Sequence, residues 1–262
     1  MANKIQENFS IVLSSFFLNF ESSIKPIINH LSDIKLNNEV YLTANFGYKE
    51  FDKADLRRNI MEFLIPHDNI FVSINLNFTG LSKLWNRAIS NCSHDWVLVI
   101  NDNITIKGSL EDFFKKINLI IKKKKYDFIL FNNSFSCFLI NKNVFDNVGF
   151  FDERLIGIGE VDIDFLFKYH KKYNTSIKSF PFDELSFLKI KEYDFLDQKE
   201  ITTILGKNTN PYNGYNSGFL MEKYIKSDEG IYGPFSEKYI IKDEEYNHYP
   251  YESFYRKNLT KL

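Results

Sequence analysis

The first 190 residues alternate between short apolar runs and segments of helical periodicity, and this alternation restricts the fold more than any other feature. Apolar runs of strand length lie at residues 9–15, 39–44, 69–76 and 95–100. Segments whose apolar residues repeat at helical spacing lie between them, at 21–34, 52–65 and 80–90. Strands that alternate with helices build a sheet with helices on its faces. The sequence therefore predicts an α/β fold with a mixed, mostly parallel sheet flanked by helices.

The pattern continues to about residue 180 and then loosens. A helix is expected over 109–126, where Ser109 is a candidate N-cap and the run Lys122–Lys125 meets the carboxyl-end dipole. Two strands, a short helix and a longer helix are expected at 127–132, 135–140, 141–149 and 159–174. In the longer helix, the residues at the spacing of a buried face are Ile163, Leu166, Phe167 and His170. Residues 1–190 are therefore predicted to form the core domain, and the Tyr-rich residues 191–262 a C-terminal extension that packs on it as an acceptor or lid region.

Composition and charge narrow the function classes. Lys and Arg number 33 against 34 for Asp and Glu, so no net basic field attracts nucleic acid. Cys92 and Cys137 are too few for a disulfide framework and match no metal-ligand spacing, which favours buried free thiols. The apolar stretch Phe9–Phe20 is followed by Glu21 and not by a small-residue cleavage site, so it is expected to be a buried first strand. No apolar run reaches the length of a membrane span, and a cytoplasmic protein is expected.

Polar side chains follow three of the predicted strands. They are Ser14-Ser15, Asn45 and the knot Asn101-Asp102-Asn103. Each alone is typical of a plain turn, but the carboxyl ends of parallel strands meet at one edge of a sheet, where ligands bind. In the knot, a carboxylate flanked by amide oxygens offers hard ligands for Mg²⁺ or Mn²⁺, which would in turn hold a diphosphate.

A second polar cluster lies in "FFDERLIGIGEVDIDF", which places five acids among Phe, Ile and Gly residues. These acids are Asp152, Glu153, Glu160, Asp162 and Asp164. On a helix, Glu160 and Asp164 share a face while Asp162 points elsewhere. The five acids therefore divide among different roles, such as capping the helix, acting as a base, or facing solvent.

Four stretches together carry a resemblance to a known family. They are "GLSKLWNRAI", "DWVLVINDNITI", "FSCFLINKNVFDNVGFFDERL" and "GEVDIDFLFKYHKKY". In this order they resemble the family 2 glycosyltransferases of bacterial surface-polysaccharide assembly, which have the Rossmann-like GT-A fold. The resemblance covers roughly residues 9–180 and is most specific over Gly149–Tyr173, where a Gly-x-Phe-Asp-Glu turn precedes an acidic helix start.

The resemblance implies a role for each candidate residue. The knot Asn101-Asp102-Asn103 would hold the diphosphate of a nucleotide-sugar donor, with a divalent metal at Asp102 and Asn103. Ser14 and Asn45 would border the nucleoside base, and Asn86 would lie behind the donor pocket. Asp162 matches the catalytic base of an inverting transfer, while Glu160 and Asp164 would lie on the acceptor side. The implied acceptor is a glycan or lipid-linked glycan of lipopolysaccharide or capsule, handled at the inner face of the cell membrane.

The chain departs from the family pattern at the metal motif, and other interpretations remain open. Where the family usually has Asp-x-Asp, this chain has Asn-Asp-Asn. Three outcomes are open: a metal bound mostly through phosphates, a metal-independent enzyme, or an inactive one. His248 would complete the metal shell or simply pack among tyrosines, and an alternative role of these tyrosines is to stack on an acceptor sugar. One rival function is a non-catalytic binding or scaffolding protein of the same fold. The other is a nucleotidyltransferase, although "SSFFLNFESS" lacks the expected glycine-rich basic loop.

Overall fold

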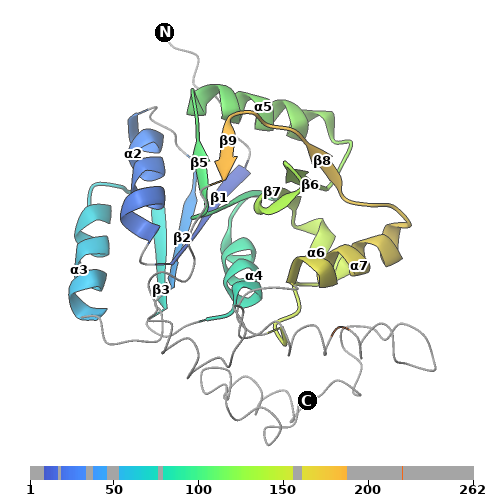
Figure 1. The fold of residues 1–262 in the computed structure, drawn as a ribbon, viewed down its shortest axis with the longest axis horizontal. Helices are drawn as coiled ribbons and strands as arrows, with labels where there is room; N and C mark the ends of the chain where they lie inside the picture. The colour runs from blue at the N-terminus through green and yellow to red at the C-terminus, as the bar shows by residue number, and fades with distance from the viewer. Residues whose placement is uncertain are drawn as a thin grey trace, which may run out of the picture.

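Figure 1 shows the chain, a computed structural model of all 262 residues, as a sheet with helices packed around it. The structure describes residues 9–16, 19–33, 38–45, 53–75, 79–155, 161–187 and Leu220. Seven strands form the main sheet in the order β3-β2-β1-β4-β7-β6-β8. Their bounds are β1 Phe9–Phe16, β2 Val40–Asn45, β3 Ile70–Asn75, β4 Trp96–Asn101, β6 Phe128–Phe131, β7 Ser134–Asn141 and β8 Lys178–Phe180. A second, two-stranded sheet pairs β5 (Ile104–Ile106) with β9 (Leu185–Phe187).

The strand directions confirm the predicted mixed, mostly parallel sheet. β1 pairs in parallel with β2 and β4, β2 pairs in parallel with β3, and β6 pairs in parallel with β8. β7 is the exception, because it runs antiparallel to both β4 and β6. The turn between β6 and β7 is Asn132-Asn133, whose φ angles are 52° and 57°. Asn tolerates this left-handed conformation, and a tight hairpin requires it at both central positions.

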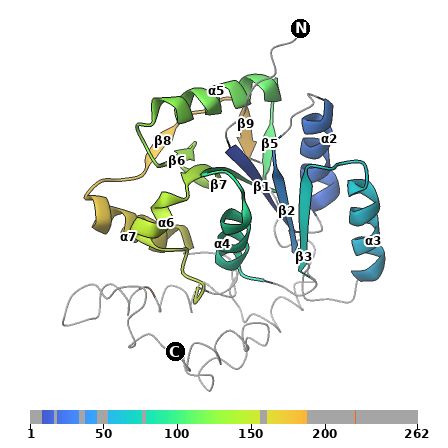
Figure 2. The same cartoon turned by 180° about the vertical axis from the view of Figure 1, so that it is seen from behind.

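Helices cover both faces of the sheet, and each face has its own apolar core (Figures 1 and 2). The helices of the first face are α2 (Lys25–Asp33), α3 (Lys53–Leu64) and α5 (Leu110–Lys123). Those of the second face are α4 (Leu81–Asn91), α6 (Asn143–Val148) and α7 (Val161–Tyr173). Leu220, the one described residue beyond β9, is buried in the second core. The predicted domain boundary at residue 190 lies outside the described residues and stays a prediction.

The helix predicted at 21–34 begins with a π-helical turn, η1 (Phe20–Ile24), and continues as α2. The Lys25 N–H donates to Phe20 O, five residues back. Pro26 explains the wider turn, because it has no N–H and its ring clashes with the carbonyl oxygen four residues earlier.

The ends of α5 agree with the sequence. Ser109 Oγ accepts a hydrogen bond from the Asp112 N–H, so the predicted N-cap is confirmed. Lys122 and Lys123 occupy the last turn, where cations interact favourably with the dipole. Lys124 then adopts a left-handed conformation with φ 45°, which ends the helix.

The predicted buried face of α7 is wrong. Ile163, Leu166 and Phe167 are 40%, 37% and 48% exposed, and His170 is exposed as well. The helix instead buries Val161, Asp164, Phe165, Lys168 and Tyr169. α7 is apolar on more than one side, so helical spacing alone does not identify the side that meets the core.

Two further expectations concern the thiols and the membrane. Cys92 and Cys137 are buried and free, as predicted. Burial raises the pKa of the Cys92 thiol to about 12 and raises that of Cys137 further. Among the described helices, none combines the length and apolar character that a bilayer span requires.

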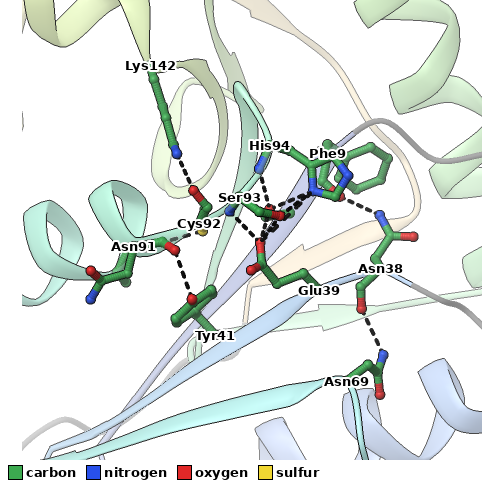
Figure 3. Close-up of polar contacts among 12 residues, drawn as sticks. Phe9, Asn38, Glu39, Tyr41, Asn69, Asn91, Cys92, Ser93, His94 and Lys142 are labelled. Atoms are coloured by element: carbon green, nitrogen blue, oxygen red, sulfur yellow. Dashed lines mark hydrogen bonds and ion pairs between the residues drawn. The ribbon is translucent and has the colours of Figure 1, made fainter.

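The amino ends of β1, β2 and β4 are joined by one carboxylate (Figure 3). Glu39 Oε2 accepts hydrogen bonds from Ser10 Oγ at 2.5 Å, the Ser93 N–H at 2.7 Å and Ser93 Oγ at 3.0 Å. His94 Nδ1 lies 4.0 Å from the same oxygen. Burial opposes the charge of Glu39, but the hydrogen bonds and His94 outweigh it and hold the pKa of this carboxyl below its ordinary value.

We expect Glu39→Gln to lower the free energy of unfolding near neutral pH by about 1–3 kcal/mol, because a charge-assisted network is lost. The folded-state pKa of Glu39 lies below the unfolded value of 4.5, so the carboxylate stabilises the fold above that value. This contribution disappears as the pH falls through the folded-state pKa. Urea denaturation over a series of pH values should therefore show that the variant loses less free energy of unfolding at acidic pH than the wild-type protein.

Glu62→Gln is the matched control, because the Glu62 side chain is 64% exposed on α3 and lies 3.9 Å from Arg58. An exposed pair of this kind contributes at most about 1 kcal/mol. An equal decrease in the free energy of unfolding at acidic pH for the wild-type protein and Glu39→Gln would contradict the stabilising role of Glu39.

Candidate functional site

Three polar strand ends meet at one edge of the sheet, as the sequence predicts. Ser14 is in register with Asn101, and Phe16 with Asn45, so β1 joins the ends of β2 and β4. The Asp102 N–H donates to Ser14 O at 2.9 Å and extends this pairing into the knot. Residues that are far apart in the sequence therefore lie together at the carboxyl ends of neighbouring strands.

The side chains of Ser14, Asn45 and Asn101 all fall on the face of the sheet that α4 covers. Side chains alternate along a strand, and Val12 and Val99, two residues before Ser14 and Asn101, pack in the core beneath α4. Asn45 is 1% exposed and Ser14 is 4% exposed. The site is therefore built between the strand ends and the start of α4.

Asn45 ties β2 to the start of α4. Its Nδ2 donates to Thr79 O at 2.9 Å, and its Oδ1 accepts from the Thr79 N–H at 3.0 Å. Both ends of the amide are thus engaged just before Gly80, the N-cap of α4. The predicted contact of Asn45 with a nucleoside base stays a prediction.

The first two residues of the knot are held by neighbouring elements. Asn101 Oδ1 accepts from Trp85 Nε1 at 3.2 Å, and Asn101 Nδ2 donates to Phe135 O at 3.5 Å. Asp102 is 8% exposed, and its Oδ2 accepts from Asn19 Nδ2 at 3.1 Å. The amide of Asn101 is directed into the fold, while Asp102 provides the carboxylate of the knot.

Among the described residues, three buried polar atoms near this edge have no hydrogen-bond partner. Asn103 Nδ2 donates to Ser136 Oγ at 2.8 Å, but Asn103 Oδ1 accepts nothing. Ser14 Oγ and Ser82 Oγ also lack partners. Most buried polar atoms in proteins are paired, so a group of unpaired ones indicates a place where a ligand supplies the missing bonds.

Ser82 is not among the site residues predicted from the sequence, although a signal for it is present. Ser82 is 1% exposed in the first turn of α4, and this helix has no side-chain cap at Gly80. The free N–H groups of a helix start attract anions. A small polar residue in the first turn after the uncapped Thr79-Gly80 step was therefore the clue.

Two consecutive residues of α4 link the knot to the turn that precedes α7. Trp85 donates to Asn101, and its ring centre lies 5.0 Å from that of Phe151. Asn86 Nδ2 donates to Phe151 O at 2.9 Å and to Glu153 Oε1 at 3.0 Å, and Asn86 Oδ1 accepts from the Phe151 N–H at 3.1 Å. The predicted place of Asn86 behind a donor pocket stays a prediction, but its structural partners are now known.

The turn itself is held by a buried ion pair. Arg154 Nε and Nη2 donate to the two carboxylate oxygens of Asp152 at 2.9 and 2.7 Å, and the Arg154 N–H donates to Asp152 Oδ1 at 3.0 Å. Both residues are 7% exposed. A two-pronged pair of this kind fixes geometry as well as charge.

The two described acids of α7 lie in different surroundings. Asp162 is half-buried, and its Oδ1 accepts from the Ile163 N–H at 3.0 Å in the first turn. Asp164 is fully buried, and its Oδ2 lies 3.3 Å from Lys168 Nζ, which also donates to Phe150 O. The contact with Lys168 lies within the fold, and the predicted place of Asp164 on the acceptor side stays a prediction.

The knot suits a divalent cation that a substrate also ligates. Asp102 supplies a carboxylate and Asn103 a buried amide oxygen without a donor, and both are hard oxygen ligands. Mg²⁺ is commonly held by one or two carboxylates together with substrate phosphates. Within the described ranges, no three His, Cys, Asp or Glu side chains gather as a metal site. His248 and Glu160, which the sequence assigned to the metal shell and the acceptor side, lie outside these ranges.

The sequence matches the model of a protein family described as "Glycosyltransferase like family 2" over residues 78–254. This stretch includes α4, the knot, the turn and α7, and it crosses the predicted boundary at residue 190. No curated protein sequence matches the chain.

Several solved structures share the fold of this chain. GalNAc-T7 with UDP, GalNAc and Mn²⁺ has a TM-score of 0.56 and 11% identity over 83% of this chain and 48% of its own. S. aureus TarS has a TM-score of 0.50 and 18% identity, over 82% of this chain and 42% of its own. The mannosyltransferase PcManGT from Pyrobaculum calidifontis, in complex with GDP-Man and Mn²⁺, has a TM-score of 0.50 and 7% identity. The match covers 68% of this chain and 56% of that protein. At these identities the likeness shows the GT-A fold alone, and this chain spans about half the length of those proteins.

We expect Asp164→Asn to lower the free energy of unfolding by about 3 kcal/mol, because Lys168 would keep a buried charge without its partner. Asp162→Asn in the same turn should change it by less than about 0.5 kcal/mol, since an amide oxygen still accepts from the Ile163 N–H. Urea denaturation of the two variants compares them directly. Equal losses would mean that both acids serve the fold.

Proposed function

The chain belongs to the glycosyltransferase-like family 2, and from this premise we propose that it transfers a sugar from a nucleotide-sugar donor to a hydroxyl of a bacterial surface glycan. One observation carries the proposal. Asp102 and three unpaired buried polar atoms gather where the ends of β1, β2 and β4 meet the start of α4. An open α/β sheet binds its ligand at such an edge.

The donor diphosphate is placed at this edge. Ser14, Ser82 and Asn103 each supply a buried polar atom that lacks a partner. The hydroxyl groups donate to phosphate oxygens, and the N–H groups at the start of α4 add a favourable dipole. The nucleoside then lies toward the ends of β1 and β2, beside Ser14 and Asn45.

Asp162 is the proposed catalytic base. Its carboxylate takes the proton from the acceptor hydroxyl as that oxygen attacks the anomeric carbon. The new carbon–oxygen bond forms on one face of the sugar while the bond to the diphosphate breaks on the other, so the configuration inverts. The nucleoside diphosphate leaves with the electrons of the broken bond.

A divalent cation would be held by Asp102 and Asn103 together with the diphosphate. When bound, it offsets the negative charge of the leaving diphosphate. Asn101 is not assigned to it, because its Oδ1 already accepts from Trp85. Two solved structures of similar fold, GalNAc-T7 and PcManGT, contain Mn²⁺.

The acceptor is proposed from the family resemblance and not from a contact in the fold. A glycan of lipopolysaccharide or capsule, free or lipid-linked, suits a transferase that works at the inner face of the cell membrane. The competing proposal is a protein that binds a nucleotide sugar without transferring it. The two asparagines beside Asp102 favour that competitor, because they leave a single carboxylate for the cation.

Asp162→Asn should all but abolish transfer, with a loss of about 10²–10⁴-fold in kcat, because general base catalysis contributes that much. Donor affinity should stay within about twofold, since Asp162 contacts the acceptor and not the nucleotide. Calorimetry with UDP- and GDP-sugars measures the affinity, and nucleotide release measures turnover.

Glu111→Gln is the matched control, because it neutralises an acid in the first turn of α5 on the other face of the sheet. Near-normal turnover by Asp162→Asn would exclude this residue as the base. Donor binding by the wild-type protein with no transfer and no donor hydrolysis would favour the non-catalytic competitor.

Asn103→Asp should tighten Mn²⁺ binding in the presence of UDP by about tenfold, because a second carboxylate replaces an amide oxygen that has no donor. Calorimetric titration of Mn²⁺ with and without UDP gives this change without any turnover. Asn101→Asp is the comparison variant and should leave the affinity within about twofold, since the Asn101 amide is directed at Trp85 and Phe135. Equal effects of both substitutions would contradict the assignment of Asn103.

A further inference from the structure

Glu153 stands out in the turn between α6 and α7 because its neighbours are all buried. Phe151, Asp152, Arg154 and Leu155 are each at most 7% exposed, whereas Glu153 is only half-buried. A surface carboxylate is ordinarily mobile and solvated. This one is carried by a backbone that buried groups hold on both sides.

Asn86 fixes the direction of the Glu153 carboxylate. Asn86 is 6% exposed, and its Nδ2 donates to Glu153 Oε1 at 3.0 Å. The same amide makes two hydrogen bonds to the Phe151 backbone, so its orientation is set before it meets Glu153. Rotation of the amide would break all three bonds, which makes Asn86 a rigid donor.

Other groups hold the same turn from the opposite side. Lys168 of α7 donates to Phe150 O, and Arg154 pairs with Asp152 inside the turn. The Leu155 N–H also donates to Asp152 O at 3.2 Å. Several contacts thus hold the turn in one conformation, and Glu153 is a half-buried side chain within it.

The surroundings of Glu153 do not explain this arrangement by charge. In the described part of the chain, no lysine, arginine or histidine forms an ion pair with Glu153. Fixing a charged side chain costs conformational entropy, up to about 2 kcal/mol for Glu. A carboxylate that is fixed in place, half open to solvent and unpaired by a cation is suited to accept hydrogen bonds from a ligand.

We propose that Glu153 binds a sugar by accepting hydrogen bonds from its ring hydroxyl groups, and that Asn86 is the positioning residue for this carboxylate. The inference rests on the proposed function and extends it. Glu153 precedes α7, the helix that carries Asp162, and Asn86 follows Trp85, which contacts the knot. Glu153 therefore lies on the part of the chain that joins the proposed donor and acceptor sides.

The chemistry of a carboxylate fits sugar hydroxyl groups. An ionised carboxylate has two oxygens and about four acceptor positions, and Asn86 occupies one of them. The remaining positions match a pair of neighbouring hydroxyl donors. Hydrogen bonds to a charged acceptor contribute more than neutral ones, so the charge of Glu153 sets the strength of the contact.

Glu153→Gln is the decisive variant. Gln keeps the length of the side chain and an oxygen that accepts from Asn86, so the turn and the thermal midpoint should not change. The KM for the bound sugar should rise about tenfold, because a charged acceptor becomes a neutral one. Glu184→Gln, at a carboxylate paired with Lys116 near β9, is the control and should leave KM unchanged.

Two assays identify which sugar Glu153 contacts. Donor hydrolysis without acceptor gives KM for the nucleotide sugar, and transfer at saturating donor gives KM for the acceptor glycan. A rise in the first assigns Glu153 to the donor sugar, and a rise in the second alone assigns it to the acceptor. Either rise supports the proposal.

Asn86→Ala tests the positioning role. It should raise the same KM as Glu153→Gln. The KM of the double variant should not exceed the higher of the two single-variant values, because both changes disable one contact. Asn118→Ala removes the same group from a buried position on α5 and should leave KM unchanged. Additive effects of Asn86→Ala and Glu153→Gln would overturn the positioning role.

An unchanged KM of Glu153→Gln in both assays, with a wild-type protein that transfers sugar, would overturn this inference and leave the proposed function intact. A wild-type protein that neither binds nor turns over UDP- or GDP-sugars would overturn the proposed function, and this inference with it. The two failures are therefore distinguishable.

Discussion

The parallel pairing of β1 with β2 and β4 is the constraint on which the rest of the structure depends. Its register places Ser14 beside Asn101 and lets the Asp102 N–H close onto Ser14 O. A slip of one residue would turn every side chain of β1 to the opposite face, burying Ser14 against α2 and exposing Leu13 to α4. The apolar residues that alternate along β1 prevent such a slip, so the core fixes the position of the polar edge.

α4 converts this edge into one connected arrangement. Its start is tied to β2 through Asn45 and Thr79, and its middle reaches the knot through Trp85 and the turn through Asn86. Helix and strand geometry is much stiffer than loop geometry, so groups held in this way keep their relative positions. The proposed donor and acceptor sides are thereby linked through a single turn of one helix.

The same region contains polar atoms that weaken the fold. Buried hydroxyl and amide oxygens without partners cost stability, and a turn that holds a fixed carboxylate costs entropy. At the opposite edge, by contrast, Glu39 Oε2 accepts three hydrogen bonds from Ser10 and Ser93. The two ends of the strands are therefore built differently, with satisfied groups at the amino ends and unsatisfied ones at the carboxyl ends. This asymmetry is expected where only one edge binds a ligand.

The sequence by itself determined the α/β class, the order of the main strands and helices, the cap at Ser109 and the meeting of polar strand ends, because these follow from local periodicity and the direction of parallel strands. Only the tertiary structure decided which face of α7 is buried, since Val161, Phe165 and Tyr169 repeat as regularly as Ile163 and Phe167. It also paired the buried Asp164 with Lys168, and it gave Asn86 and Glu153 their contact across 67 residues. Spacing along a chain records which side chains share a face, but burial and pairing depend on what that face meets.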